Sequence, residues 1–523
     1  MVGACPLRMI FSFPHRFQLG PLGGYLSLAL VMLLSGCASD GPQMAAFRIN
    51  EITDPMAQVP VNRFDHWKPS DAAPGNVPDL SSTHAAARVN QVLSGAQDHD
   101  LIELIDVGLR NNPSTRSSWE QARAMAAALG MSESMWLPSL TAQMTAGYWR
   151  YPFPAPVTAI SLSGTTVYPT LNLSWTIFDY GRSSDIDRAT QQLYSANHML
   201  NRNHQDVAYK IQQAFYGLIA ARARVEAGQA TLKQSSRNAD SIRHQLEHGL
   251  ATQPEFLMAA QDQAKAAYEL QNLHGHVMEK EADLAESLGF RPDMQLKTVS
   301  LEKHDLPKDS EHSADEIIDA ALLNRPDLAA RLADLRAKDA EIRKAEANYW
   351  PQFSLALQGG WKIWNYHNAE QNSAQQGYQQ VSTSQPLTGA GISMDWNLFE
   401  GFSGVNSVKA AEAKRNAAQA DFDALQLKIM KEVWKAYAEF KTSSRKREFA
   451  IAMLKASEKS YEGALKAYEN GVATVIELIT AERNLAQARY TEIDSRTSLL
   501  VSAAALVYAS GTGEQTASFG AGQ

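Results

Sequence analysis

Two histidines and a glutamate near the middle of this chain have the spacing of a zinc-hydrolase motif. His244, Glu247 and His248 fit H-x-x-E-H, in which two imidazoles one helical turn apart bind zinc and the carboxylate acts as a base. His274 and His276 follow about one hairpin length later and could supply further ligands. The spacing alone therefore allows a metal hydrolase.

Most of the chain is repeated, and the second copy lacks this motif. At an offset of 222 residues (466 − 244 = 222), the corresponding positions hold Lys466, Glu469 and Asn470. The motif also lies in the last turn of a long helical pattern, where the helix dipole favours a cationic histidine. The sequence contains no Gly-rich phosphate loop and no nucleophile elbow. We therefore predict no catalytic residue, no metal site and no cofactor, and we expect a protein that is not an enzyme.

A repeated tetrapeptide follows the motif and its counterpart in the second copy. Glycine at the first position can take the positive φ that ends a helix, and threonine at the fourth can cap the next helix. The tetrapeptides are Gly249, Leu250, Ala251 and Thr252 in the first copy and Gly471, Val472, Ala473 and Thr474 in the second. Each is expected to form the tip of a helical hairpin.

Long apolar seams with three- and four-residue spacing lead into both tips. In the first copy the seam covers about 182–247, which makes a helix of roughly 100 Å at ~1.5 Å per residue. The shorter return helices end near residues 288 and 508. Such seams are typical of coiled coils, so each copy is predicted to contain a long coiled-coil helical hairpin.

Each copy begins with a helix and two strands. The helices are predicted over 101–135 and 314–348, and a proline near the start of each, Pro113 or Pro326, either enters the helix or breaks it. Strands of about ten residues are predicted from apolar and polar side chains that alternate along the chain. The alternating stretches cover 140–148, 171–177, 353–357 and 392–398.

The first 36 residues have the pattern of an export signal. A basic start precedes an apolar stretch over 22–34 that is short for a transmembrane helix. The following Leu34-Ser35-Gly36-Cys37 resembles the bacterial lipoprotein signal, in which the cysteine is lipidated. The next residue is Ala38 and not Asp, which by the same resemblance permits transfer to the outer membrane. The alternative is an ordinary secretory signal that contains a cysteine. Residues 37–98 are rich in Pro, Asp, Asn and Ser, which favours an extended tether.

The alternating strands favour a membrane barrel over a soluble sheet. Strands of about 9–11 residues can cross a bilayer, and aromatic residues gather at the expected strand ends as an interfacial girdle would. These aromatic residues are Tyr148, Trp149, Tyr151, Tyr168, Trp361, Trp364 and Trp396. Four strands cannot close a barrel, because the smallest barrels need about eight. The functional unit is therefore expected to be a homo-oligomer. The net charge of the chain is −8, so we expect no basic surface that would bind nucleic acid.

Several local motifs accompany this order of elements. They are Asn324-Arg325-Pro326-Asp327-Leu328, Tyr349-Trp350-Pro351, Trp396-x-x-Phe399-Glu400-Gly401 and Tyr468-x-x-Gly471. Together they resemble the TolC-like outer membrane efflux family over essentially 100–510, and the lipid signal resembles its lipoprotein branch. The resemblance implies a homotrimer with a shared twelve-stranded outer-membrane barrel on an α-helical tunnel that extends into the periplasm. It also implies a periplasmic membrane-fusion adaptor and an inner-membrane pump as partners, with small molecules conducted passively.

The same resemblance assigns roles to the hairpin tips and to three nearby residues. The tips would form the periplasmic entrance, where the adaptor docks, and Tyr468, Glu477 and Glu255 would form its gate. Ala473 and Thr480 depart from the family's pattern, in which an arginine and a second acid can stand at these positions. The chemistry of the latch is therefore left open, and a solvated helix face is the alternative for Glu477.

The predicted fold is mainly α with a membrane β-barrel, built from two structural repeats. The expected segments are a lipoprotein signal (1–36), a lipid-anchored tether (37–98), a first repeat (99–290), a linker (291–313), a second repeat (314–511) and a tail (512–523). Two alternatives to an efflux channel are a type I secretion duct for polypeptides and a lipid-anchored periplasmic coiled-coil scaffold.

Overall fold

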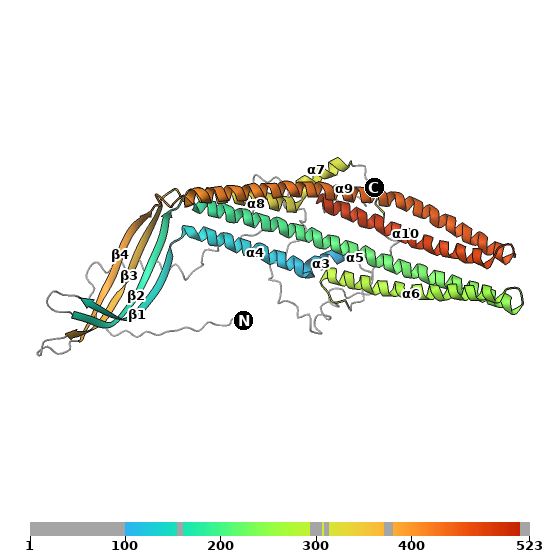
Figure 1. Ribbon diagram of the computed structural model, residues 1–523, viewed down its shortest axis with the longest axis horizontal. Coiled ribbons are helices and arrows are strands. Elements are labelled where there is room, and N and C mark those ends of the chain that lie inside the picture. Colours follow the sequence, from blue (N-terminus) through green and yellow to red (C-terminus); the bar gives the residue numbers. More distant parts are fainter. Residues whose placement is uncertain (1–99, 154–159, 293–305, 308–312, 371–379, 513–523) are drawn as a thin grey trace. The chain divides into compact units, whose positions relative to one another are not determined.

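The computed structural model describes residues 100–153, 160–292, 306–307, 313–370 and 380–512. The expected signal, the tether and Cys37 lie outside these ranges, as do most of the linker and all but the first residue of the tail. Within the described ranges the protein is mostly helical, and its four strands form one sheet (Figure 1). No helix of the described part combines the length and hydropathy of a membrane-spanning helix.

The described chain contains one series of elements twice. The first series is α3 (Leu101–Asn111), α4 (Pro113–Glu133), the short 3-10 helix η2 (Ser134–Trp136), β1 (Ser139–Phe153), β2 (Ile160–Phe178), α5 (Arg182–Glu247) and α6 (Gln253–Leu288). The second is α7 (Ala314–Asn324), α8 (Pro326–Ala347), β3 (Gln352–Glu370), β4 (Gln380–Asp395), α9 (Ser403–Glu469) and α10 (Val475–Ser510). The return helices start 222 residues apart (475 − 253 = 222), so the predicted duplication is confirmed.

Each single helix expected over 101–135 and 314–348 is in fact two helices. Asn112 and Arg325 have extended backbones with ψ of 127° and 122°, because a residue before proline is driven out of the helical region. Pro113 and Pro326 therefore start new helices instead of continuing old ones. Asn112 also caps α4, since its side-chain oxygen accepts a hydrogen bond of 2.8 Å from the Ser114 N–H.

The four strands form an antiparallel sheet in the order β1-β2-β3-β4, and they are longer than expected. They contain 15, 19, 19 and 16 residues, whereas the alternation predicted about ten. Apolar alternation marks only part of each strand, and segments without it, such as Gly359 and Gly360 in β3, still pair with their neighbours. At its end β4 is shorter than expected, so Trp396 and Leu398 lie beyond the sheet.

The register of the sheet places the alternating apolar residues on one face. Leu140 pairs with Leu173, and Leu173 pairs in turn with Leu357. Large apolar side chains on this face are exposed, among them Leu140, Met144, Tyr148, Trp361, Ile392 and Met394. The expected aromatic girdle is only partly correct, because the pairing puts Trp149, Tyr168 and Trp364 on the opposite, polar face. There the ammonium of Lys362 lies 5.0 Å from the ring centre of Tyr168 and 3.4 Å from that of Trp364.

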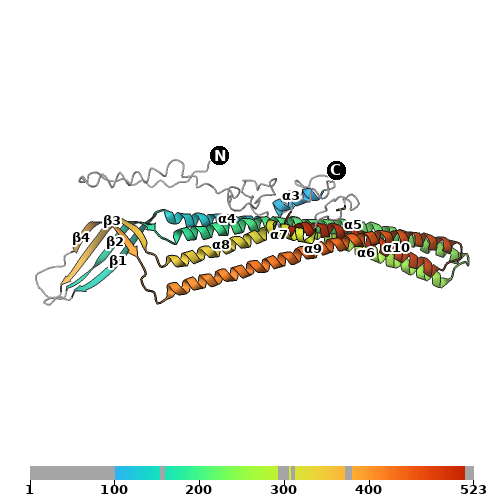
Figure 2. The same ribbon diagram turned by 90° about the horizontal axis from the view of Figure 1, so that it is seen from above.

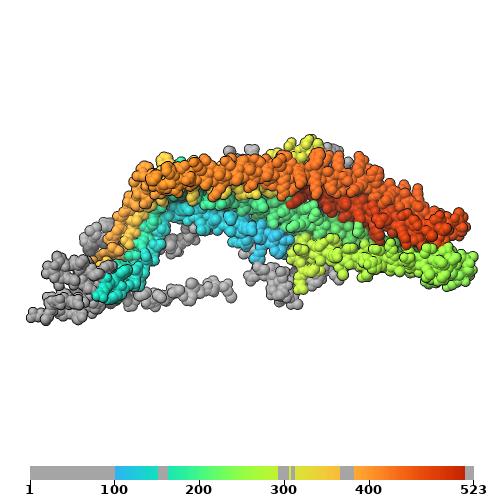
Figure 3. Space-filling model, in the orientation of Figure 1, coloured from blue at the N-terminus to red at the C-terminus, as the bar shows by residue number. Residues whose placement is uncertain are grey.

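The helices pack in the same way in both copies (Figures 1 and 2). The long helix α5 contacts α4 and α6, and α9 contacts α8 and α10, while α5 also joins the copies by contacts with α8 and α10. Val207, Ile211 and Leu218 of the predicted seam are buried on α5, but Phe215 is buried in place of the expected Ala214, which is only partly buried. In contrast, α9 buries far fewer of its residues, and much of it forms an open surface in Figure 3.

Candidate functional site at the helical hairpin tips

The tip between α5 and α6 is a tight glycine-dependent turn. Gly249 has a φ of 72°, and its N–H donates to the Leu246 carbonyl at 2.9 Å. The next N–H, of Leu250, reaches back to the Gln245 carbonyl at 2.7 Å. These two bonds form a Schellman motif, which satisfies the last carbonyls of the helix and requires the left-handed backbone that glycine adopts without strain.

The tip between α9 and α10 repeats this geometry. Gly471 has a φ of 70°, its N–H donates to the Tyr468 carbonyl at 2.9 Å, and the Val472 N–H donates to the Ala467 carbonyl at 2.8 Å. The predicted helix stops are therefore confirmed in both copies. The turns leave Leu250 and Val472 at the two ends with 80% and 83% of their surfaces exposed. Each hydrogen-bonded turn thus presents one apolar side chain to the solvent.

Both return helices begin with a capping box. Thr252 and Thr474 are the N-caps, and each hydroxyl accepts a hydrogen bond from the N–H of the glutamate three residues later. In return, one carboxylate oxygen of Glu255 accepts from the Thr252 N–H and that of Glu477 from the Thr474 N–H, both at 2.7 Å. The predicted threonine caps are confirmed, and the glutamates complete them.

The capping geometry gives Glu255 and Glu477 a structural task that our sequence reading missed. The spacing Thr-x-x-Glu before an apolar helix is itself the signal for this task. Hydrogen bonds from the Thr252 backbone and hydroxyl lower the pKa of Glu255, so its carboxylate is charged at neutral pH. Glu255 therefore carries negative charge at its tip, next to a helix N-terminus that favours it.

A tyrosine connects the two hairpins close to the tips. The Tyr468 hydroxyl on α9 donates a hydrogen bond of 2.6 Å to the side-chain oxygen of Gln245 on α5. Burial, and then the negative charge of Glu255, raise the pKa of the phenol, which keeps it protonated as a donor. No sequence signal singled out Gln245. Ala473 provides no polar link, and the Thr480 hydroxyl bonds to the Ile476 carbonyl of its own helix.

Apolar side chains fill the space between the hairpins behind this link. This tip cluster consists of Ala239, Ile242, Ala259, Val475 and Ile479, and Tyr468 packs against it. Its members come from α5, α6 and α10, so the two hairpins share one small core. Separating the hairpins would expose this core to water, at a cost that scales with its area.

Two polar links lie further from the tips than this cluster. The Arg483 guanidinium on α10 donates to Asp262 on α6 at 2.7 Å, and the Asn238 amide on α5 donates to Glu482 on α10 at 2.6 Å. Burial raises the pKa of Glu482 to about 7, an effect that the bond from Asn238 only partly opposes. Both links join the first hairpin to the second, and neither was found from the sequence.

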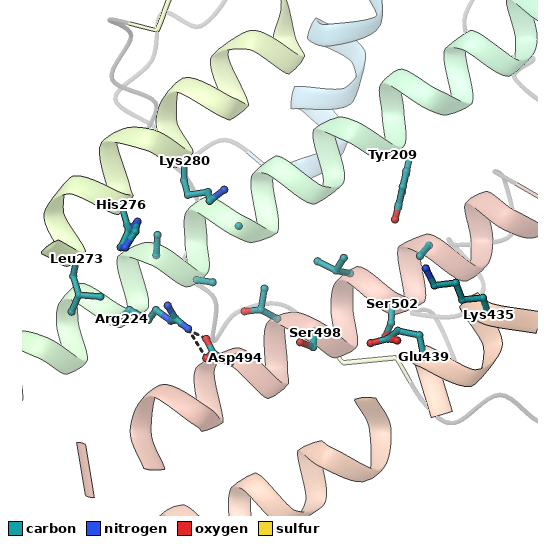
Figure 4. A pocket seen from close by; sticks show the side chains of 16 residues that line it. Tyr209, Arg224, Leu273, His276, Lys280, Lys435, Glu439, Asp494, Ser498 and Ser502 are labelled. Carbon is teal, nitrogen blue, oxygen red and sulfur yellow. Dashed lines mark hydrogen bonds and ion pairs between the residues drawn. The ribbon is translucent and has the colours of Figure 1, made fainter. Parts of the chain in front are cut away.

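A cavity of about 720 Å³ lies between α5, α6, α9 and α10, further along the helices from the tips (Figure 4). Arg224 and Asp494 face each other on its wall in a bidentate ion pair. Arg224 donates from Nε to Oδ1 of Asp494 at 2.8 Å and from Nη2 to Oδ2 at 2.5 Å. Two other basic side chains on the wall also have acidic partners, because Lys280 pairs with Asp283 and His276 with Glu279. Three of the basic side chains on the wall are therefore paired with acids, and Lys435 is a fourth basic residue there.

The histidines of the H-x-x-E-H motif are exposed and have local partners. His244 lies 3.3 Å from Glu247, and a ring nitrogen of His248 lies 2.7 Å from the His244 carbonyl. Within the described ranges, no group of three or more His, Cys, Asp or Glu side chains could hold a metal ion. These side chains are polar groups at a helix C-terminus, each with a partner in its own helix.

Comparison with known proteins gives one consistent result. The sequence matches the family described as "Outer membrane efflux protein" over residues 104–290 and 317–512. It is 25% identical to Protein CyaE of Bordetella pertussis, covering 79% of this chain and 84% of that protein, and 23% identical to outer membrane protein OprJ of Pseudomonas aeruginosa, covering 80% and 85%. Its fold is similar to the solved Campylobacter jejuni CmeC outer membrane channel, with a TM-score of 0.66 at 17% identity over 80% of this chain and 86% of that one.

Proposed function

Because this chain belongs to the outer membrane efflux protein family, we propose that it is the exit duct of a tripartite efflux system. It would conduct small molecules passively from an inner-membrane pump and a periplasmic adaptor across the outer membrane. The family consists of channel proteins rather than enzymes. The observation that carries the proposal is the attachment of one open β-sheet to two long helical hairpins with rigid, exposed tips.

The open sheet supports a homotrimer. In the order β1-β2-β3-β4, the outer strands β1 and β4 each pair on one side only within the described residues, and unpaired backbone groups are costly in lipid. In a ring of three copies, β4 of each protomer pairs with β1 of the next, which gives twelve strands and no edge. The open surface of α9, with exposed Leu427, Trp434 and Phe449, would be covered by the neighbouring copy.

The hairpin tips are the proposed docking site for the adaptor. Leu250 and Val472 are almost fully exposed on turns whose shape is fixed by Gly249 and Gly471. The adjacent Ala251, Thr252, Ala473 and Thr474 are small, so a partner could approach the backbone closely. An apolar side chain on a preformed turn loses little conformational freedom when it enters a partner's pocket.

The proposed gate lies just behind these tips. Tyr468 holds the second hairpin against the first through Gln245, and Glu255 and Glu477 place negative charge beside it. In a trimer these carboxylates would form a ring that favours cations at the entrance. The lipid anchor on Cys37 would hold the chain at the outer membrane, with the helices extending into the periplasm.

The domain assignment is part of the same proposal. Segments 1–36 and 37–98 would be the signal and the tether, and 291–313 would link the repeats 99–290 and 314–511, leaving 512–523 as a tail.

The experiment is complementation in a strain that lacks the gene, with variants at the tips. We expect wild-type protein in outer-membrane fractions to restore resistance to pump substrates and to run as a trimer. The double variant Leu250→Asp and Val472→Asp should form the trimer but lose resistance, because a charge at each tip opposes docking of the adaptor in an apolar pocket. Leu257→Asp, at an exposed apolar position on α6, is the matched control and should keep resistance. A water-soluble monomer from the Cys37→Ala variant would contradict the channel.

A further inference from the structure

A carboxyl group with an incomplete set of hydrogen bonds lies between the two hairpins. Only 2% of the surface of Glu482, on α10, is exposed. One of its oxygens accepts the bond of 2.6 Å from Asn238 on α5, and the other is buried and has no hydrogen-bond partner in the described part of the chain. A charged carboxylate with so few donors is costly away from water, whereas a protonated one costs much less.

The groups around Glu482 do not compensate for this burial. From α6 the negative Asp262 raises the pKa of Glu482, and Arg483 and Arg489 on its own helix lower it more weakly than burial raises it. Arg483 is already bound to Asp262 at 2.7 Å. From α9, Tyr461 approaches the Asn238 amide at 3.5 Å and not the carboxyl itself. The site is therefore arranged to hold a neutral acid while the hairpins are in contact.

We propose that Glu482 is a proton-operated switch of the entrance, in which the protonated carboxyl keeps the α9–α10 hairpin against the α5–α6 hairpin and its ionisation favours their separation. Water can reach the carboxylate only when the hairpins part, so ionisation and separation favour each other. The switch lies behind the tip cluster, to which α10 contributes Val475 and against which Tyr468 packs, so a small rotation of α10 would disturb the packing of Tyr468. This inference rests on the proposed function, because it concerns the opening of that channel.

The direction of the pH dependence follows from the two states. In the contact state the pKa of Glu482 is about 7, against 4.5 for a carboxyl in water. Glu482 therefore contributes fully to the contact between the hairpins below about pH 4.5. This contribution is lost as the pH rises through about 7. The contact equilibrium can shift by at most a few hundred-fold across this window.

The test measures the opening of the full-length protein in planar bilayers between about pH 5 and about pH 8. For the wild type we expect the open probability to rise by about ten-fold or more across this range. Glu482→Gln keeps the size and the acceptor for Asn238 but cannot ionise, so it should remain at the low-pH level throughout. Glu458→Gln removes an exposed acid on α9 and should behave like the wild type.

A second measurement does not require conductance. Hydrogen exchange of residues 475–490 in the same preparations should accelerate with pH, after correction for the intrinsic rate, in the wild type but not in Glu482→Gln. Equal pH profiles for the wild type and Glu482→Gln in both measurements would overturn the switch while leaving the channel intact. Failure to form any channel at any pH, with exchange still dependent on Glu482, would instead reject the proposed function.

Discussion

Tyr468 and Gln245 are joined by a hydrogen bond of 2.6 Å between side chains whose backbones also form the two tips. The Gln245 carbonyl accepts the Leu250 N–H, and the Tyr468 carbonyl accepts the Gly471 N–H. Each residue thus closes its own helix through its backbone and holds the other hairpin through its side chain. The shape of the tips and the contact between the hairpins are therefore mechanically connected.

Removing the Tyr468 hydroxyl should make the entrance easier to open. Tyr468→Phe leaves a partly buried amide oxygen without its donor, at a cost of about 1 kcal/mol, which corresponds to roughly a five-fold change in the opening equilibrium. Single-channel recording should show more frequent opening. Tyr268→Phe, at an exposed position on α6, is the control. Identical recordings from the two variants would show that the bond does not restrain the entrance.

Two substitutions of Glu477 separate its capping task from its charge. Glutamine can still accept the Thr474 N–H, so Glu477→Gln should keep α10 intact and reduce only the preference of the channel for cations. Glu477→Ala should also increase hydrogen exchange in the first turn of α10 several-fold, because the cap is lost. Ion selectivity and exchange are the two measurements. An unchanged selectivity in Glu477→Gln would remove this residue from the gate.

Arg325 should be among the most sensitive positions for stability. Its side chain is 3% exposed and binds Asp327 and Glu432, each at 2.7 Å. Arg325→Ala removes the nearest cation of both acids, and we expect a loss of about 3–5 kcal/mol in chemical denaturation. Arg331→Ala is the control, since this exposed arginine lies 3.9 Å from Asp334 and should contribute less than about 0.5 kcal/mol. A similar loss in both variants would contradict the buried network.

The same network predicts sensitivity to acid. Burial would raise the pKa of Asp327, but the hydrogen bonds and charges of Arg325 and the charge of Arg202 outweigh it, so the pKa lies below the ordinary value of 3.8. A lowered pKa contributes stability above the ordinary value and loses it as the pH falls below that value. Wild-type stability should therefore fall below about pH 4, and Asp327→Asn should show less of this fall. A denaturation series across that range provides the measurement.

Neighbouring residues on β1 should distinguish a membrane barrel from a soluble sheet. Met144 lies on the apolar face and is 70% exposed, whereas Gln143 is exposed on the opposite face. A lipid-phase thiol reagent should label Met144→Cys and not Gln143→Cys, because only the first side chain would face the acyl chains. A water-phase reagent should give the reverse pattern. Labelling of both variants from water alone would favour the periplasmic scaffold.

Local sequence signals were sufficient for the tips and the long helices. Gly249, Gly471, Thr252 and Thr474 were assigned correctly, because a left-handed turn and an N-cap depend on residues within one helical turn. The apolar seam of α5 likewise depends on a short period along a single helix. Prediction was weaker at the prolines, where Pro113 could either enter or break a helix, and at the ends of the strands.

The sequence by itself determined the duplication, the order of helices and strands and the chemistry of the turns, since each follows from spacings within or between copies. Only the tertiary structure decided which distant residues meet. Gln245 faces Tyr468, Asn238 faces Glu482 and Asp262 faces Arg483 because two hairpins more than 200 residues apart pack together. Burial of Glu482 is likewise a property of that packing, and no local pattern distinguishes it from the exposed glutamates of the same helices.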